Sequence, residues 1–379
     1  MFNGRLLLGP GPSLVSEKVL WAMSRPTIGH LDPEFIKIMR GVQDKLRQVF
    51  QTSNELTYPV SGTGTAGMET CLTNLIEPED RVAVLINGVF GQRMANLVRR
   101  LSAGTCYEIN FPWGSPIEPS TVKDILDSEG SFDVICAVHI DTSTGVQSDI
   151  CSLGEIIRSD NEDTVFIVDA VTSLGGSELY VDAWQIDACF SGSQKCLSCP
   201  PGLAPVTFGP RALKKRKARK TALPSFYFDI LELEKYWGDD RAYHHTAPVN
   251  MIYALDAALD DVLREGLENR WERHRRVSVN LVHQLEKMGI ELLPTFNTAS
   301  RPLTAVKIPE GVSDSFVRDE LLSGYNIEIG GGLGELKGKV WRIGLMGESA
   351  RNVHVRTLVE ALEDVLRREK WKASSQPKA

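Results

Sequence analysis

The sequence predicts an α/β protein built around a mostly parallel sheet. Short apolar runs alternate with helical patterns through much of the chain, and two of these runs end close to the reactive side chains of Asp169 and Lys195. Strands that alternate with helices form parallel sheets covered on both faces, and ligands bind at the carboxyl edge of such sheets. An acid and an amine are therefore expected in one crevice.

The composition is that of an ordinary globular protein, with 42% hydrophobic and 24% charged residues among 379. The net charge of -7 argues against a general nucleic-acid binder. No apolar run has the length that a membrane helix needs, and residues 1–10 lack the pattern of a signal peptide. We therefore expect a cytoplasmic protein that binds neither nucleic acid nor membrane.

The first elements follow from local signals. Residues 5–13 contain several prolines and predict an extended entry. A helix is predicted from Pro33 to about Phe50, because Asp32 is a good N-cap and proline suits the first helical position. A strand over 56–60 then leads into a glycine-rich turn and the start of the next helix.

Beyond this turn the pattern alternates. Further strands are predicted at 82–86, 134–139, 166–168, 188–190 and 204–208. The helices between them are predicted at 91–103, 119–129 and 151–159. Two long helices follow at 248–264 and 266–288. The remainder suggests strands at 303–308, 326–329 and 340–344, helices at 313–323 and 351–368, and a disordered tail after Lys370.

This pattern divides the chain into three parts. Residues 1–20 form an N-terminal extended arm, residues 21–265 a large α/β domain, and residues 266–379 a smaller C-terminal α+β domain. We expect the candidate crevice to belong to the large domain, since Asp169 and Lys195 both lie there.

Two other features favour structural interpretations. Cys196 and Cys199 form a CxxC, but without a second pair or suitably spaced histidines we expect packing around Lys195 and no metal site. The basic run at 211–220 allows a nucleic-acid contact, but a solvated helix end explains it without contradicting the acidic total.

The glycine-rich turn matches GxGxxG at Gly62, Gly64 and Gly67. A dinucleotide site also needs an acid at the end of the next strand, where this chain has Asn87 and Gly88. A glycine turn that opens a helix still presents N–H groups to a phosphate, although a plain tight turn fits equally well.

Alone, Asp169 is also consistent with an N-cap or a metal ligand, and Lys195 with a solvent-facing lysine. Together with a phosphate turn they indicate one ligand, pyridoxal phosphate. Its aldehyde reacts with an amine, its pyridine nitrogen pairs with a carboxylate, and its phosphate suits a helix N-terminus.

Several sequence segments, taken in order, resemble those of a known family. The segments LLLGPGPS, NGVFGQR, TSTGV, VDAVTSLGG, SGSQK, YHHTAPV and KVWRIGLMG occur in the order typical of class V aminotransferases. These are fold type I pyridoxal phosphate enzymes, and the resemblance is to their alanine:glyoxylate and serine:pyruvate (serine:glyoxylate) branch. It implies a large domain with a mostly parallel seven-stranded sheet between helices, plus a smaller α+β domain.

The resemblance also implies roles for individual residues. Lys195 is the Schiff-base lysine and Asp169 the partner of the pyridine nitrogen. Gly64 and Thr65 bind the phosphate, with help from Gln194.

A further set of residues completes the implied site. Thr142 places a hydroxyl near the cofactor ring, and Phe90 stacks on it. Tyr243 and Thr246 reach the phosphate of the neighbouring subunit, which implies a homodimer with shared active sites. Arg342 grips the substrate carboxylate, a bidentate task that suits guanidinium.

Each role has a structural alternative. Phe90 is also a plausible core residue, and Arg342 a plausible partner in a structural ion pair. The adjacent His244 and His245 suggest a metal site, but they lack a carboxylate partner. The chain also departs from the animal enzymes, which have histidine at Thr65 and tryptophan at Phe90. These departures put cofactor affinity and substrate fit in question.

We therefore expect transfer of an amino group from alanine or serine to glyoxylate, since no second basic residue is placed to receive a side-chain carboxylate. The rival is ureidoglycine:glyoxylate aminotransferase, a family with glutamine and asparagine at His30 and Tyr243. Cysteine desulfurase would need histidine at Gln194 and Phe90. A non-catalytic pyridoxal phosphate-binding regulatory protein has only the basic run in its favour.

Overall fold

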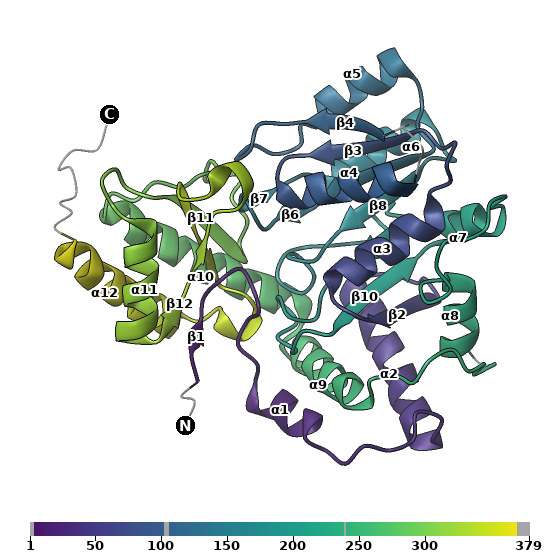
Figure 1. Ribbon diagram of the computed structural model, residues 1–379, viewed down its shortest axis with the longest axis horizontal. Helices are drawn as coiled ribbons and strands as arrows, with labels where there is room; N and C mark the ends of the chain where they lie inside the picture. The colour runs from purple at the N-terminus through teal and green to yellow at the C-terminus, as the bar shows by residue number, and fades with distance from the viewer. Residues whose placement is uncertain (1–3, 102–105, 239, 370–379) are drawn as a thin grey trace.

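The structure is a computed structural model that describes residues 4–101, 106–238 and 240–369. A seven-stranded sheet forms its centre (Figure 1). Its strands, in spatial order, are β2 (Leu56–Ser61), β10 (Leu203–Phe208), β9 (Ala188–Phe190), β8 (Val165–Asp169), β5 (Val134–Val138), β3 (Val82–Ile86) and β4 (Cys106–Asn110). Only β10 runs antiparallel to its neighbours, so the predicted mostly parallel seven-stranded sheet is confirmed.

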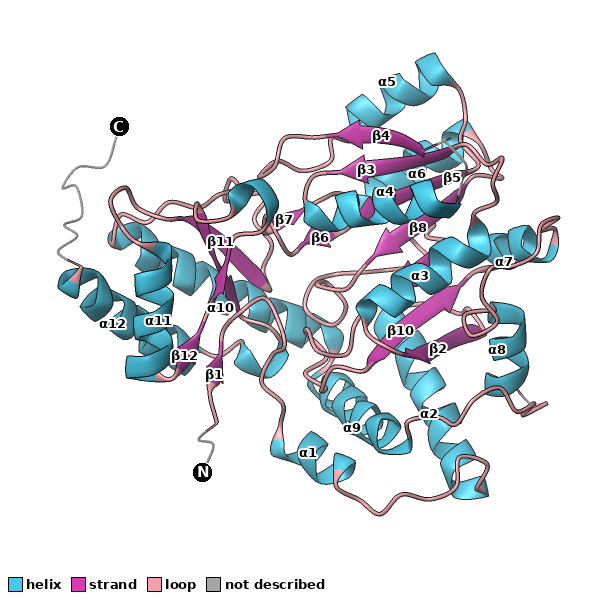
Figure 2. Cartoon of the chain, in the orientation of Figure 1, coloured by secondary structure: helices cyan, strands magenta, loops and turns pink. Residues whose placement is uncertain are grey.

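Helices cover this sheet on both faces, as the fully buried strands β3, β5 and β8 require. Figure 2 shows two of them, α3 and α4, crossing the face nearer the viewer. The helices around the sheet are α2 (Pro33–Phe50), α3 (Gly64–Leu75), α4 (Val89–Leu101), α5 (Pro119–Glu129), α6 (Ile150–Asp160), α7 (Pro210–Lys217), α8 (Ile230–Trp237) and α9 (Val249–Glu265).

The C-terminal part of the chain forms a second, smaller sheet with its own helices. Its antiparallel sheet has the order β11 (Leu303–Lys307), β14 (Val340–Gly344) and β13 (Gly330–Gly331). Three helices pack on it: α10 (Leu267–Lys287), α11 (Asp314–Tyr325) and α12 (Asn352–Arg368). These elements have a hydrophobic core of their own, separate from the core around the large sheet.

The N-terminal segment contacts first the C-terminal part of the structure and then the large part. Its strand β1 (Leu6–Leu7) pairs in parallel with β12 (Ile327–Glu328), and Leu8 is buried in the C-terminal core. The short helix α1 (Glu17–Met23) then contacts α9 of the large part. The residues between β1 and α1 therefore pass from the C-terminal core to the large core. On the way, Pro10 and Gly11 contact the side chain of Lys195.

Most predicted elements agree with the structure, but several short or exposed ones were missed, among them β4, α1 and α8. Strand β4 escaped prediction because it lies at the sheet edge and its residues are only partly buried. Helices α1 and α8 are short and carry little periodic signal. Residues 102–103 of one predicted helix and the tail from residue 370 lie outside the described residues.

The basic run is only partly a solvated helix end. It does form the end of α7, and Lys214 is exposed there. Arg216, however, donates from Nη2 to both carboxylate oxygens of Asp229 at 2.8 and 2.9 Å, and Arg219 donates to the carbonyl of Ile76 at 2.8 Å. The prediction was wrong for these two residues because their guanidinium groups hold the neighbouring loops together.

The cysteines of the CxxC are buried, with Cys196 0% and Cys199 1% exposed. Cys196 lies beside the Thr172 carbonyl and Gly176, which agrees with a packing role around Lys195. Among the described residues, no helix combines the length and the apolar character that a membrane span requires.

Candidate active site

Two neighbouring strands deliver the predicted acid and amine to one edge of the sheet. Strand β8 ends at Asp169, which is the register partner of Phe190 at the end of β9. The loop after β9 folds back on β10 through the Ser191 N–H, which donates to the Pro205 carbonyl at 2.8 Å. Because β8 and β9 are parallel, this loop brings Lys195 to the same edge as Asp169.

Asp169 is a buried carboxylate, 2% exposed, and it accepts a hydrogen bond from the Val171 N–H at 2.8 Å. Burial raises its pKa to about 7, against the lowering effect of that hydrogen bond. The nearby carboxylate of Asp141 raises it further. A cationic partner placed here would therefore be held strongly, because it would stabilise the ionised acid.

Lys195 is 8% exposed, and its Nζ donates to the Pro10 carbonyl. The backbone of Gly11 lies against the same side chain: a Cβ at this position would lie 2.7 Å from Lys195 Cδ. Burial lowers the pKa of Lys195 to about 8, and the positive charge of Arg342 lowers it further. A larger fraction of this amine is thus neutral and nucleophilic than for an exposed lysine.

The N-terminus of α3 faces this edge. A Cβ on Gly64 would lie 3.1 Å from Val171 Cγ2 and 3.6 Å from the Ser191 carbonyl, so the first turn abuts the loops after both β8 and β9. Its leading N–H groups have no partner within the helix. The side chain of Gln194 is adjacent in the second loop, and its Oε1 is buried without a hydrogen-bond partner among the described residues.

The start of α4 supplies the aromatic ring. The backbone N–H of Phe90 donates to Asp141 at 3.0 Å, which fixes the helix entry. The guanidinium of Arg93 lies 4.9 Å from the centre of the Phe90 ring and contacts the Thr65 hydroxyl at 3.5 Å. Phe90 and Thr65 are therefore linked through one cation, which sequence reasoning missed.

Asp141 was also missed. It is fully buried at the end of a short hairpin, β6 (Ile140–Asp141) and β7 (Val146–Gln147), and accepts from the Ser143 N–H at 2.8 Å. Burial raises its pKa despite these hydrogen bonds. A carboxylate directly before the TSTG segment is the sequence signal that marks it.

Arg342 reaches the site from the C-terminal sheet. It is 7% exposed, and it donates to the Gly331 carbonyl at 2.7 Å and to the Thr142 carbonyl at 3.1 Å. The Thr142 hydroxyl in turn shares a 2.5 Å hydrogen bond with Thr172. Burial lowers the pKa of Arg342 to about 10, which leaves it cationic at neutral pH. Among the described residues no carboxylate lies within ion-pair distance of Arg342, although the charge of Asp141 acts to raise its pKa.

The two residues expected to serve a neighbouring subunit lie on the surface. Tyr243 is 66% exposed and its ring centre is 5.7 Å from that of His30, while Thr246 is exposed. Between them, His245 shares a 2.9 Å hydrogen bond with Ser61 at the end of β2. This segment therefore lies next to the turn before α3, but neither residue bonds to the described residues around Lys195.

Comparison with known proteins matches these features to one family. The model of the family described as aminotransferase class-V matches residues 15–335. The chain is 39% identical to a (S)-ureidoglycine–glyoxylate transaminase of Bacillus subtilis, covering 96% of this chain and 91% of the relative. It is 38% identical to an alanine–glyoxylate aminotransferase of Drosophila melanogaster, covering 97% and 93%. The crystal structure of an alanine–glyoxylate aminotransferase from Nostoc sp. superposes with a TM-score of 0.94 at 44% identity, covering 97% and 96%.

Proposed function

The chain belongs to the class V aminotransferases, and on that premise we propose that it transfers the amino group of alanine or serine to glyoxylate with pyridoxal 5'-phosphate. The observation that carries the proposal is the convergence of Asp169, Lys195 and the N-terminus of α3 at one edge of the sheet. These are the three groups that the nitrogen, aldehyde and phosphate of the cofactor require.

The residues present fit the cofactor. Gly64 and Thr65 offer N–H groups at the positive end of α3 to a phosphate, and the side-chain amide N–H groups of Gln194 would add donors. We propose that the Phe90 ring stacks on the cofactor and that the Thr142 hydroxyl contacts its ring. When bound, pyridoxal phosphate supplies an aldehyde for the amino group and a ring that withdraws electrons from the substrate carbon.

Three side chains of this protein then have separate roles in the proposed reaction. Lys195 would hold the aldehyde carbon of the cofactor, and its amine, once freed by the incoming amino acid, would accept the proton from the substrate Cα. Asp169 would keep a proton on the pyridine nitrogen, because a cation at this position stabilises the ionised form of this buried acid. Arg342 orients the substrate carboxylate, and its two carbonyl contacts fix the guanidinium plane for that task.

We also propose a homodimer with shared sites. Tyr243 and Thr246 are exposed beside the turn before α3, where a partner's phosphate site has access to them. Phe226, which stacks on His244 between these two residues, is 68% exposed, and Leu20 and Trp21 of α1 are 50% and 78% exposed. Exposed large apolar side chains are typical of a subunit interface.

The substrate proposal has one rival. The relative from Bacillus subtilis named for ureidoglycine favours that donor, whereas His30 and Tyr243 replace the glutamine and asparagine of its family. These two rings are in contact in this structure, so they act as one discriminating pair. A donor with a side-chain carboxylate is not favoured, because the nearby cation Arg93 already engages Phe90 and Thr65.

A donor panel tests the proposal. Alanine, serine, ureidoglycine and aspartate are each assayed against glyoxylate, and the last three also against pyruvate. We expect the highest kcat/KM with alanine or serine. Preference for ureidoglycine would establish the rival, and a His30→Gln/Tyr243→Asn double variant should then leave that preference unchanged. If alanine or serine is preferred, the same double variant should shift the preference toward ureidoglycine.

The cofactor is tested separately by absorbance. The purified protein should show a band near roughly 420 nm that alanine bleaches. Lys195→Ala should lack this band and lose about 100- to 10,000-fold in rate, whereas the exposed control Lys214→Ala should keep both. A band that persists in Lys195→Ala would contradict the enzyme proposal.

A further inference from the structure

A buried arginine joins helix α10 to the candidate active site. Arg270 lies in the first turn of α10 and is 2% exposed. Its Nη1 donates to the Glu265 carboxylate at 2.6 Å, its Nε to the Gly175 carbonyl at 3.0 Å and its Nη2 to the Cys196 carbonyl at 2.7 Å. A buried charge is costly unless it is paired and hydrogen-bonded, and these three contacts meet that condition. One planar group therefore holds three separate segments of the chain.

The two carbonyls belong to the loops that carry the predicted acid and amine. Gly175 lies in the loop that follows Asp169, and Cys196 is the residue directly after Lys195. These loops also approach each other, because a Cβ on Gly175 would lie 4.0 Å from the Cys196 carbonyl oxygen. Arg270 therefore joins the two loops at the point where they meet.

The sheet fixes Asp169 more directly than Lys195. Asp169 is the last residue of β8, so the strand ladder sets its position, whereas Lys195 lies in a loop beyond the end of β9. The Lys195 carbonyl accepts from Ser13 Oγ at 2.7 Å, and the next carbonyl, that of Cys196, accepts from Arg270. These two contacts hold the backbone around Lys195, and the one from Arg270 ties it to the loop that follows Asp169.

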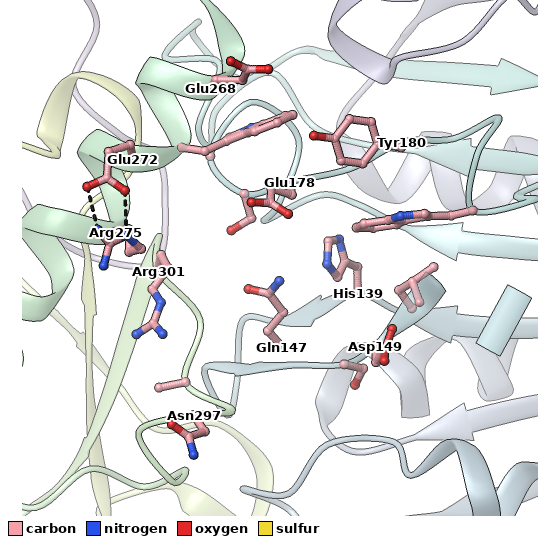
Figure 3. Close-up of a pocket in the computed structure, with 17 residues that line it drawn as sticks. His139, Gln147, Asp149, Glu178, Tyr180, Glu268, Glu272, Arg275, Asn297 and Arg301 are labelled. Atoms are coloured by element: carbon pink, nitrogen blue, oxygen red, sulfur yellow. Dashed lines mark hydrogen bonds and ion pairs between the residues drawn. The ribbon is translucent and has the colours of Figure 1, made fainter. Parts of the chain in front are cut away.

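Arg270 lies on the inner side of α10. Other side chains of this helix, among them Glu268 and Glu272, border an open hollow of the surface together with Tyr180 (Figure 3). Trp271 packs there on Tyr180, with ring centres 5.5 Å apart. Arg270 does not border this hollow. Its charge therefore faces the two loops and not the solvent.

Glu265 supplies the opposite charge. It is the last residue of α9, and its carboxylate also accepts from Arg273 Nη2 at 2.9 Å. Burial acts to raise the pKa of Glu265, but the hydrogen bonds and charges of Arg273 and Arg270 lower it to about 2. The carboxylate is therefore ionised at neutral pH, and it orients the Arg270 guanidinium toward the two carbonyls.

We propose that Arg270 is a positioning residue for Lys195, which it holds within reach of the cofactor aldehyde through the carbonyls of Cys196 and Gly175. This inference rests on the proposed transaminase function. If Arg270 served stability alone, its replacement would weaken the fold without a particular effect on Lys195. The two roles therefore differ in what they predict for two forms of the cofactor.

Arg270→Lys tests the inference, because an ammonium group keeps the charge but cannot hold two carbonyls and a carboxylate as a guanidinium does. Stopped-flow absorbance measures the second-order rate at which the full-length apoprotein captures pyridoxal phosphate. Calorimetry measures its affinity for pyridoxamine phosphate, which has the same ring and phosphate but no aldehyde to bond to Lys195. We expect Arg270→Lys to slow capture by about 10- to 100-fold, as for a misplaced reacting group, and to leave the pyridoxamine phosphate affinity unchanged.

Arg158→Lys is the matched control. Arg158 likewise donates to two carbonyls, those of Glu162 and Thr164 at 2.7 and 3.0 Å, and to one carboxylate, that of Asp187 at 3.0 Å. These acceptors lie just before β8 and β9, at the opposite end of the same two strands. Arg158→Lys should lower the free energy of unfolding about as much as Arg270→Lys, yet leave the capture rate unchanged.

A second variant, Glu265→Gln, keeps the test valid if Arg270→Lys fails to fold. It removes the charge that orients the guanidinium and leaves both carbonyl acceptors in place. Capture should therefore slow several-fold, less than in Arg270→Lys. Urea denaturation shows which variants are folded under the assay conditions.

Three results would overturn the inference. One is an equal loss of pyridoxal phosphate capture and pyridoxamine phosphate affinity in Arg270→Lys, which indicates a general loosening of the site. Another is capture slowed by the same factor in Arg158→Lys, which assigns the effect to stability. The third is capture at the wild-type rate in every folded variant of Arg270 and Glu265. These results leave the proposed function standing, whereas a wild-type protein that captures no pyridoxal phosphate refutes both.

Discussion

Asp169 is the register partner of Phe190, the last residue of the neighbouring parallel strand. This pairing fixes the carboxylate at the same level of the sheet as the loop that carries Lys195. The acid and the amine are both buried, yet they are not paired directly: Asp169 accepts from a backbone N–H, and Lys195 donates to Pro10. Both groups therefore face the space between the strand edge and α3, where we propose that the cofactor binds.

The pKa of Lys195 predicts how cofactor capture depends on pH. The neutral amine attacks the aldehyde, and it is the minor form below a pKa of about 8. The second-order rate of pyridoxal phosphate capture by the apoprotein should therefore rise about tenfold per pH unit up to pH 8 and level off above it. Stopped-flow absorbance measures this rate. A rate that continues to rise to pH 10 would show that the amine has the pKa of an exposed lysine.

Replacement of Arg342 should separate substrate binding from cofactor binding. Arg342→Ala is expected to reduce kcat/KM for every amino donor by about 10- to 100-fold, mainly through KM, because a charge-assisted bidentate contact is lost. The absorbance band should persist, since Arg342 is not a cofactor residue in this proposal. Arg342→Lys should recover only part of the activity because an ammonium group cannot bind in a bidentate manner. Kinetics equal to those of the exposed control Arg367→Ala would remove Arg342 from the site.

Shared active sites predict complementation between two inactive variants. One subunit carries Lys195→Ala, and the other carries Tyr243→Ala with Thr246→Ala. In a mixed dimer, one site combines the intact Lys195 of the second subunit with the intact Tyr243 and Thr246 of the first. Statistical exchange should restore about a quarter of the wild-type activity, because half of the dimers are mixed and each has one intact site.

The complementation control is each variant refolded alone, which should stay inactive or weakly active. A mixture no more active than the sum of these controls would show that each subunit builds its site alone.

The close approach of Gly88 to Asp141 predicts a stability effect. A Cβ at Gly88 would lie 2.5 Å from Asp141 Oδ1. This carboxylate has no room to retreat, because it is fully buried and held by the N–H groups of Ser143 and Phe90. Gly88→Ala should lower the free energy of unfolding by about 1–3 kcal/mol, measured by urea denaturation.

Gly29→Ala is the matched control for this variant, because no heavy atom lies within 4 Å of a Cβ at that position. It should change the free energy of unfolding by less than about 0.5 kcal/mol. Equal stability of the two variants would show that Asp141 moves aside at no cost.

The sequence by itself determined the type and position of those helices and strands whose apolar residues follow a local pattern. The helix of residues 33–50 was predicted from its cap and periodicity, and the strands ending at Asp169 and Phe190 from short buried runs. The order of motifs identified the family. These signals are local, so each is complete within one stretch of chain.

Tertiary structure alone decided which distant residues meet. The contact of Pro10 with Lys195 depends on β1 joining the C-terminal part, and the contact of Arg342 with Thr142 depends on two separate sheets meeting. His139 and Arg301 border one hollow of the surface although no sequence pattern connects them. Such contacts follow from packing between elements, and a local sequence pattern carries no information about which surfaces will face each other.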